Sequence, residues 1–158
     1  MRIRTEFEAD CPPDVAWRAL HDPSVAAELY APILVMQPER AFPETLTTGT
    51  EMRARLRGLG VLPVGVQLIR ITDVAAPSGA DWPRTMRDHG EPLSGPLALL
   101  DTWRHEITIS RSRASDHRAV WTDELRIGGA FAPLFRPALA VMWRWRGRKL
   151  RRLARNWR

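Results

Sequence analysis

The C-terminal segment 130–158 most constrains the fold, because it is the one long stretch of the chain with helical periodicity. Its apolar residues recur at steps of three and four, so on a helix they would form one broad stripe that must cover another surface. Pro133 and Pro137 predict that regular helix begins only near Arg136, and Gly147 predicts a weak point beyond which the helix extends past that surface. The stripe consists of Phe131, Leu134, Phe135, Ala138, Leu139, Met142, Trp145, Leu150, Leu153 and Trp157.

The second half of this segment is strongly basic. Residues 144–158 hold eight of the 24 Lys and Arg residues and no acidic residue, so the total formal charge of +6 leaves the rest of the chain at −2. The simpler explanation is a solvated helix end, where positive charge complements the helix dipole. The functional explanation is a surface for an anionic partner.

The size and the cysteine content of the chain fit a single intracellular domain. A chain of 158 residues is long enough for one substantial core, so we expect one domain over 1–158. Cys11 is the sole cysteine and the first residues are charged, so we expect no disulfide, no signal peptide and a cytoplasmic location. No apolar run approaches the length of a membrane span, so any membrane contact would be peripheral.

The rest of the chain shows helix-start signals and strand-like alternation. Residues 2–9 alternate between apolar and polar side chains, as a strand with one buried face does. Pro13 and Pro23 each suit the first turn of a short helix, and the second helix should end before Pro32. The pattern is strand-like from 33 to 72, including the runs 52–57 and 64–71. Further strands are predicted over 84–89 (between loops at 76–83 and 90–96), 101–110 and 118–127, with a polar turn at 111–117 and Gly128-Gly129 before the long helix.

This order of elements, together with several short motifs, resembles the START-like or SRPBCC superfamily over nearly the whole chain. The resemblance implies an α+β helix-grip fold, in which a curved antiparallel sheet wraps around a long C-terminal helix and two short helices follow the first strand. It implies no particular catalytic residue, because members range from pollen-allergen-like proteins to polyketide cyclases and lipid carriers. The motifs are Phe7-Glu8-Ala9 followed by Pro12-Pro13-Asp14-Val15-Ala16-Trp17, Gly95-Pro96 upstream of Trp103-Arg104-His105, Thr122-Asp123-Glu124-Leu125, and Trp145-Arg146 with Leu150.

The last predicted hairpin places polar residues on its apolar face. A turn centred near Ala114 would set His105 opposite Asp123, Trp103 opposite Leu125 and Ile107 opposite Trp121, with Asp101 on the same face. The other face, where Arg104 would lie across from Glu124, should be solvated. Directly opposed residues have β-carbons about 5 Å apart, so His105 and Asp123 could form a hydrogen bond.

Two interpretations of this pair remain open. His105 could act as a general acid or base on a ligand in an apolar cavity, with Asp123 orienting its ring. Alternatively, the pair satisfies two buried polar groups and has no further role. The histidines show no metal-ligand spacing and the chain has no phosphate-binding or dinucleotide motif, so we expect no metal and no cofactor.

Two classes of function follow from the sequence. One is a module that binds a hydrophobic small molecule, such as a lipid, an isoprenoid or a polyketide-like compound, between the sheet and the C-terminal helix. The other, which the resemblance to polyketide cyclases implies, is a cyclase or dehydratase that uses His105 as general acid or base with Asp123 orienting it. The expected ligand-binding residues are Asp101, Trp103, Ile107, Trp121, Leu125, Met142 and Trp145. The basic end could contact an acyl carrier protein or an anionic membrane surface, whereas nucleic acid is disfavoured because no binding motif accompanies it. The residues expected in that contact are Arg144, Arg148, Lys149, Arg151, Arg152 and Arg155.

Overall fold

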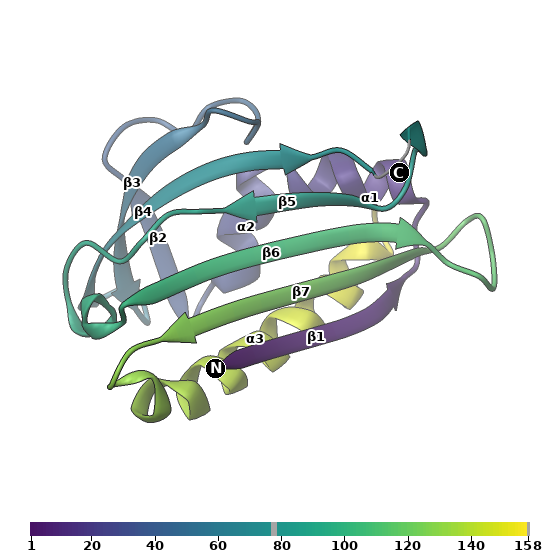
Figure 1. Ribbon diagram of the computed structural model, residues 1–158. Helices are drawn as coiled ribbons and strands as arrows, with labels where there is room; N and C mark the ends of the chain where they lie inside the picture. Colours follow the sequence, from purple (N-terminus) through teal and green to yellow (C-terminus); the bar gives the residue numbers. More distant parts are fainter. Residues whose placement is uncertain (77–78, 158) are drawn as a thin grey trace.

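The computed structural model describes residues 1–76 and 79–157 (Figure 1). Part of the loop predicted over 76–83 and the last cation of the basic segment, Arg158, lie outside the described residues. The elements are β1 (Arg2–Ala9), α1 (Pro13–Leu20), α2 (Pro23–Tyr30), β2 (Leu34–Pro38), β3 (Glu51–Gly58), β4 (Leu62–Val74), β5 (Arg84–Asp88), the 3₁₀ helix η2 (Pro96–Leu99), β6 (Thr102–Arg111), β7 (Ala119–Gly128) and α3 (Ala132–Ala154).

The strands form one curved antiparallel sheet. Their order is β1-β7-β6-β5-β4-β3-β2, and every neighbouring pair is antiparallel. Figure 1 shows α1, α2 and α3 on the same side of this sheet. The predicted α+β class is therefore confirmed, with a long C-terminal helix and two short helices directly after β1.

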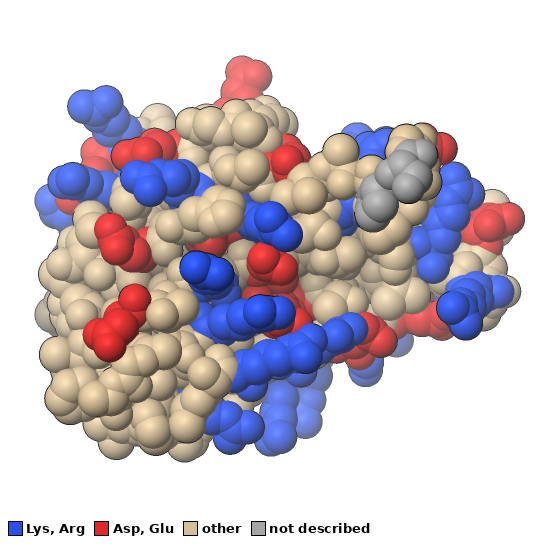
Figure 2. Space-filling model, viewed as in Figure 1, with Lys and Arg blue, Asp and Glu red and all other residues tan. Residues whose placement is uncertain are grey.

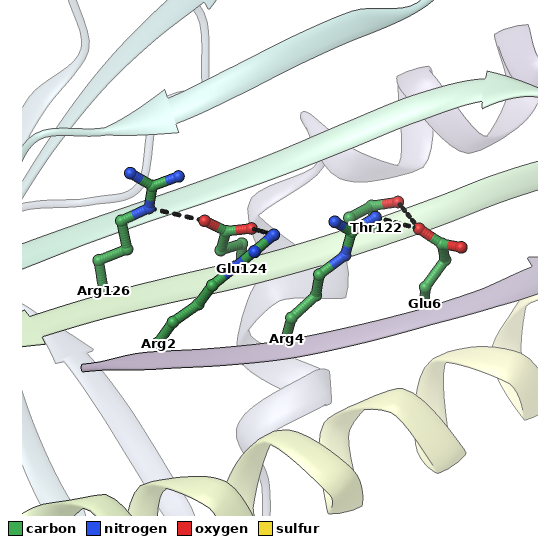
Figure 3. Close-up of polar contacts among 6 residues, drawn as sticks. All are labelled: Arg2, Arg4, Glu6, Thr122, Glu124 and Arg126. Carbon is green, nitrogen blue, oxygen red and sulfur yellow. Dashed lines mark hydrogen bonds and ion pairs between the residues drawn. The ribbon is translucent and has the colours of Figure 1, made fainter.

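Strand alternation separates an inner from an outer face. On β6 and β7 the odd-numbered side chains from His105 to Ile109 and from Trp121 to Ile127 are buried under the helices. Positive and negative side chains intermingle on the outer face (Figure 2). There Glu124 pairs with Arg2 and Arg126, while Glu6 contacts Arg4 and Thr122 (Figure 3). The exposed Arg4–Glu6 pair contributes little stability, whereas Glu124 is buried on this otherwise solvated face and is paired with two arginines.

The register of the β6–β7 hairpin differs from the predicted one. His105 lies opposite Leu125, and Asp123 opposite Ile107, because the turn is centred on Ser115 rather than near Ala114. Ser112 Oγ accepts from the backbone N–H of Ala114 within this loop. Each residue of β6 therefore faces a β7 residue two positions later than predicted. Because side chains alternate with a period of two, the same residues still lie on the inner face. On the outer face Arg104 accordingly lies opposite Arg126, and Glu124 opposite Glu106.

The helix α3 begins earlier than the prolines predicted. It starts at Ala132, with Pro133 in its first turn and Pro137 within the helix, so the expected start near Arg136 is wrong. Pro133 loses no helical hydrogen bond because the N–H groups of the first turn have no partner within the helix, whereas Pro137 gives up the bond to the carbonyl of Pro133 and the helix continues through it. Gly147 does not end the helix, which continues to Ala154, and a β-carbon added at this position would lie 3.7 Å from Phe7 of β1. The glycine thus lies at a close contact between α3 and the sheet.

The buried face of α3 is also rotated from the predicted stripe. Phe131, Leu134 and Trp145 are exposed, whereas Trp143 and the charged Arg146 are buried. The basic half does not extend past the sheet, because Leu150 and Ala154 are fully buried against the core around Phe7 and Trp121. The residues that α3 buries are Ala132, Leu139, Trp143, Arg146, Leu150 and Ala154.

The core divides into two apolar clusters. The larger lies between α1, α2, the end of α3 and the sheet, and includes Ile107 and Trp121. The smaller lies under the start of α3 and includes Leu125 and Ile127. His105 and Asp123 occupy the positions between these clusters on β6 and β7. Buried polar groups at such a boundary must satisfy one another or a ligand.

Candidate ligand cavity

A cavity of about 110 Å³ lies between the inner face of the sheet and the three helices. Its walls are mainly aliphatic and aromatic, and side chains of α2 and of the β3–β4 pair close it opposite α3. The polar exceptions are Tyr30, Gln67, Asp88, His105 and Arg146. A mostly apolar cavity with a few convergent polar groups is the usual form of a small-molecule site.

The carboxylate of Asp123 organises the polar end of this cavity. Its Oδ1 accepts from His105 Nε2 at 2.8 Å and from Trp143 Nε1 at 2.8 Å. Its Oδ2 lies 3.2 Å from Arg146 Nη1, and the residue is 3% exposed. Burial alone raises the pKa of a carboxyl, but the Arg146 charge and the bonds from His105 and Trp143 outweigh it and hold the pKa of Asp123 below its usual value. Asp123 is therefore ionised at neutral pH.

This arrangement fixes one nitrogen of His105 and leaves the other available. Because an ionised carboxylate only accepts, Nε2 must carry the hydrogen that it donates to Asp123. Arg146 Nη1 lies 3.5 Å from the same Nε2, but both are donors toward Asp123, so we do not count this contact as a hydrogen bond. The hydrogen bonds that His105 forms through its ring within the described residues involve Nε2 and not Nδ1. The cavity is thus faced by an imidazole that Asp123 holds in one tautomer.

Arg146 is a buried cation with few partners. Its guanidinium carbon lies 4.5 Å from the ring centre of Tyr30 and 4.8 Å from that of Trp143, so both aromatic rings stabilise its charge. The residue is only 3% exposed, and its Nε is buried without a hydrogen-bond partner in the described part of the chain. Burying guanidinium N–H groups without acceptors is unfavourable. The structure therefore leaves a donor beside the cavity.

The opposite wall supplies further polar atoms. Asp88 lies directly across from His105 on β5, and burial raises the pKa of its carboxyl. Gln67 on β4 donates from Nε2 to the carbonyl of Leu68, which orients the amide and leaves its buried Oε1 without a partner in the described residues. Burial also raises the pKa of Tyr30 at the end of α2. These groups come from three elements that only the tertiary fold brings together.

The structure brings some of the predicted site residues together and separates others. His105 and Asp123 form the predicted hydrogen bond, although diagonally rather than as a facing pair. Asp101 and Trp145 are exposed and do not line the cavity, and Leu125 is buried in the smaller core cluster beneath α3. The predicted residues that do line the cavity are Trp103, His105, Ile107, Trp121 and Met142.

Sequence reasoning missed Trp143, Arg146, Tyr30, Asp88 and Gln67. Trp143 and Arg146 lie on the same helical face as Ala132, Leu139 and Leu150. A stripe defined by apolar residues alone does not follow this face, because it excludes an arginine. Tyr30 ends a short helix, and Asp88 faces the cavity from the least regular strand pattern. Neither has a local signal.

The basic end of α3 is less uniform than the sequence indicated. Arg144, Arg148, Arg152 and Arg155 are exposed, and Arg151 lies over the ring of Phe7. Lys149 instead donates to the carbonyls of Glu28 and Ala31 at the end of α2. It therefore joins α2 to α3 rather than facing a partner.

No known family model matches this chain. A search of curated proteins gives no match either. Solved structures match over nearly the whole chain. A hypothetical protein of Helicobacter pylori is 12% identical, with a TM-score of 0.70 over 98% of this chain and 88% of its own. A protein of Chromobacterium violaceum is 16% identical, with a TM-score of 0.63 over 98% and 97%.

DynU16, described as a putative protein in the dynemicin biosynthetic locus, is a third neighbour. It is 16% identical, with a TM-score of 0.52 over 96% of this chain and 46% of its own. The likeness shows the fold. At these identities it assigns no activity, so the shared feature is an antiparallel sheet with a C-terminal helix in a helix-grip-like arrangement.

Proposed function

We propose that this protein binds a hydrophobic small molecule between its sheet and helices. The observation that carries the proposal is the mostly apolar cavity with His105 and Arg146 in its wall, both of which contact the buried carboxylate of Asp123. Core packing alone has no need for a charged cluster beside an unfilled space. The resemblance of the sequence to the START-like or SRPBCC superfamily, which includes lipid carriers and polyketide cyclases, supports the same conclusion. So does the fold shared with a putative protein from a biosynthetic locus.

The cavity volume limits the portion of a ligand that it holds. An engineered apolar cavity of about 150 Å³ binds benzene, so the space of about 110 Å³ here suits a single ring or a short branched chain. A lipid, isoprenoid or polyketide-like molecule would insert one such portion. A longer portion requires α2 and α3 to separate from the sheet.

A cavity-filling substitution tests this proposal. Ala26 lines the cavity from α2, whereas its neighbour Ala27 does not, so Ala26→Leu fills the space and Ala27→Leu is the matched control. With ethylbenzene as the probe, titration followed by tryptophan fluorescence or NMR should show binding to the wild type and to the control only. Equal binding to the Ala26→Leu variant contradicts the cavity as the site.

The second candidate function is that of a polyketide cyclase or dehydratase. It is supported by His105, which Asp123 holds in one tautomer through Nε2 and not Nδ1. In this function Nδ1 removes or returns a proton on the bound molecule, and Asp123 keeps the ring in place. A carrier needs no such group.

Co-purified ligands distinguish the two functions. Native mass spectrometry of the protein from its own host should identify a bound hydrophobic molecule in the wild type and in His105→Ala. If the protein is a dehydratase, the variant retains a substrate heavier than the wild-type ligand by one water. If both proteins hold the same compound, the carrier function is supported and the catalytic role of His105 is rejected.

A further inference from the structure

We infer that the ligand of this cavity carries an uncharged hydrogen-bond acceptor, such as a ketone carbonyl, which accepts from Arg146. This inference rests on the proposed function and adds the chemical class of the ligand. Its basis is the buried guanidinium, which is 3% exposed and leaves Nε unpartnered in the described residues. His105 Nε2 and Trp143 Nε1 do not share this need, because both already bond to Asp123.

The surrounding charges favour a neutral acceptor over an anion. Asp123 already balances the charge of Arg146 at 3.2 Å, and Asp88 is a second carboxyl in the cavity wall. A ligand carboxylate would add an uncompensated negative charge beside these groups in a site of low dielectric. A carbonyl oxygen adds an acceptor without adding charge. Tyr30 and Trp143 stack on the guanidinium of Arg146. The ligand's carbonyl oxygen would therefore approach the N–H groups at the edge of the guanidinium plane.

Three ring-sized probes separate the alternatives. Ethylbenzene offers no acceptor, acetophenone offers a neutral carbonyl, and benzoate offers an anion. A purely apolar cavity prefers ethylbenzene, because the carbonyl of acetophenone loses its hydration on binding. If Arg146 provides a hydrogen bond, acetophenone should bind more tightly than ethylbenzene, and benzoate should bind most weakly at neutral pH.

The variant Arg146→Lys tests the donor itself. Lysine keeps a positive charge near Asp123 but lacks the Nε donor and the planar group stacked by Tyr30. Acetophenone should then bind about tenfold more weakly, while ethylbenzene should be unaffected, because a hydrogen bond to a charged group is worth at least that factor. Circular dichroism and thermal unfolding verify that the variant is folded.

The probe results distinguish failure of the proposed cavity function from failure of the neutral-acceptor inference. If no probe binds the wild type, both the cavity function and this inference fail. If ethylbenzene binds but acetophenone binds no better, only the neutral-acceptor inference fails. Tightest binding by benzoate also overturns it, because the site would then select an anion. The ranking of probes on the wild type needs no variant, so it remains decisive if Arg146→Lys does not fold.

The exposed side of α3 supports a second proposal, which does not depend on the cavity. We propose that this side lies on an anionic membrane surface. Leu134, Val141 and Trp145 are 72%, 62% and 38% exposed, and they recur at helical steps with Phe131 and Ala138 on one side of the helix. The same steps continue into arginines at 148, 152 and 155, which are all exposed.

The composition of this side matches an interface between lipid tails and headgroups. The apolar half can insert among acyl chains, the arginines can pair with anionic headgroups, and Trp145 lies between the two halves. None of Arg144, Arg148 and Arg152 has an ion-pair partner within residues 1–76 and 79–157. Figure 2 shows a largely uncharged area at the end of the molecule where Figure 1 places the start of α3. No helix among the described residues is long and apolar enough to cross a membrane.

Vesicle co-sedimentation tests this surface with matched variants. Vesicles containing phosphatidylglycerol should bind the protein and pure phosphatidylcholine vesicles should bind it much less, with the difference reduced by salt. Leu134→Glu should weaken binding, whereas Leu62→Glu should not, because Leu62 is 61% exposed on β4, away from α3. Arg148→Ala should weaken it about fivefold and Arg113→Ala in the β6–β7 turn should not.

Equal binding to both vesicle types, or equal losses in the control variants, overturns the membrane proposal. A sedimentation-velocity result in which the wild type dimerises and Leu134→Glu does not would assign this side to a second copy of the chain instead. Binding to an acyl carrier protein in place of vesicles would likewise replace the membrane as the partner.

Discussion

Arg146 Nη1 of α3 lies 3.2 Å from Asp123 Oδ2 of β7, and both side chains are buried. The first prediction concerns this pair. Asp123→Asn leaves the charge of Arg146 unpaired and should destabilise the protein by about 3–5 kcal/mol, measured by urea unfolding. Replacing both residues, as Asp123→Asn with Arg146→Met, should recover much of the loss, because no buried charge then remains. The exposed Asp116→Asn is the control and should change stability by less than about 0.5 kcal/mol.

The same pair predicts a dependence on pH. Since the folded-state pKa of Asp123 is below its usual value of 3.8, its stabilisation is complete above that value and is lost as the pH falls through the folded pKa. The difference in unfolding free energy between wild type and Asp123→Asn should therefore be constant near neutrality and shrink in acid. A difference that does not shrink would mean that the carboxylate is not the stabilising form.

Asp88 should behave in the opposite sense. Burial raises its pKa above the usual 3.8, so it favours the folded state at low pH, and that contribution is lost as the pH rises through the folded pKa. In Asp88→Asn the amide oxygen can still accept from the backbone N–H groups of Arg70 and Gly90. The variant should be at least as stable as the wild type at neutral pH and should show no advantage in acid. Chemical unfolding at both pH values measures this; a variant that is less stable at neutrality contradicts it.

Lys149 should stabilise the end of α2. Lys149→Met removes the ammonium that bonds to the carbonyls of Glu28 and Ala31, so those helix-end acceptors lose a charged donor. The expected loss is about 1–3 kcal/mol, with faster amide hydrogen exchange in α2. The exposed neighbour Arg148→Met is the matched control, because Arg148 forms no such bond within the described residues. Equal exchange in the two variants would contradict the link between the helices.

Gly147 should tolerate alanine in spite of its position against the sheet. The added β-carbon would lie 3.7 Å from Phe7 and 3.8 Å from Thr5, which are ordinary contact distances. Gly147→Ala should therefore stabilise the helix by about 0.4–1 kcal/mol and raise the melting temperature by about 2–4 °C. Gly65→Ala provides the contrast, because its β-carbon would lie 2.1 Å from the carbonyl oxygen of Ser94 and its φ is +144°. That variant should be destabilised.

Much of the fold could be predicted from local patterns. Alternation in β1, β6 and β7, the proline-started α1 and α2, and the helical periodicity near the C-terminus are all short-range signals that the structure confirms. The side of the sheet that carries His105 and Asp123 follows from the same period of two, which is why an error of register left the inner face correct.

The exact pairing and the face of α3 could not be predicted in this way. The turn around Ser115 depends on hydrogen bonds within the loop, and one such change moves every facing pair. The buried face of α3 contains Arg146, which the hydrophobic pattern excludes, because its burial depends on partners from α2 and β7.

The order of elements, the inner face of the last hairpin and the location of positive charge near the C-terminus could thus be inferred from local sequence patterns. Which of those charges is buried depends on how the helices and strands pack together. Arg146 is stable in the interior because Asp123, Tyr30 and Trp143 surround it from three different elements, and Lys149 is held because α2 ends beside it. The compensation of a buried charge depends on residues distant in the chain, so no local pattern can record it.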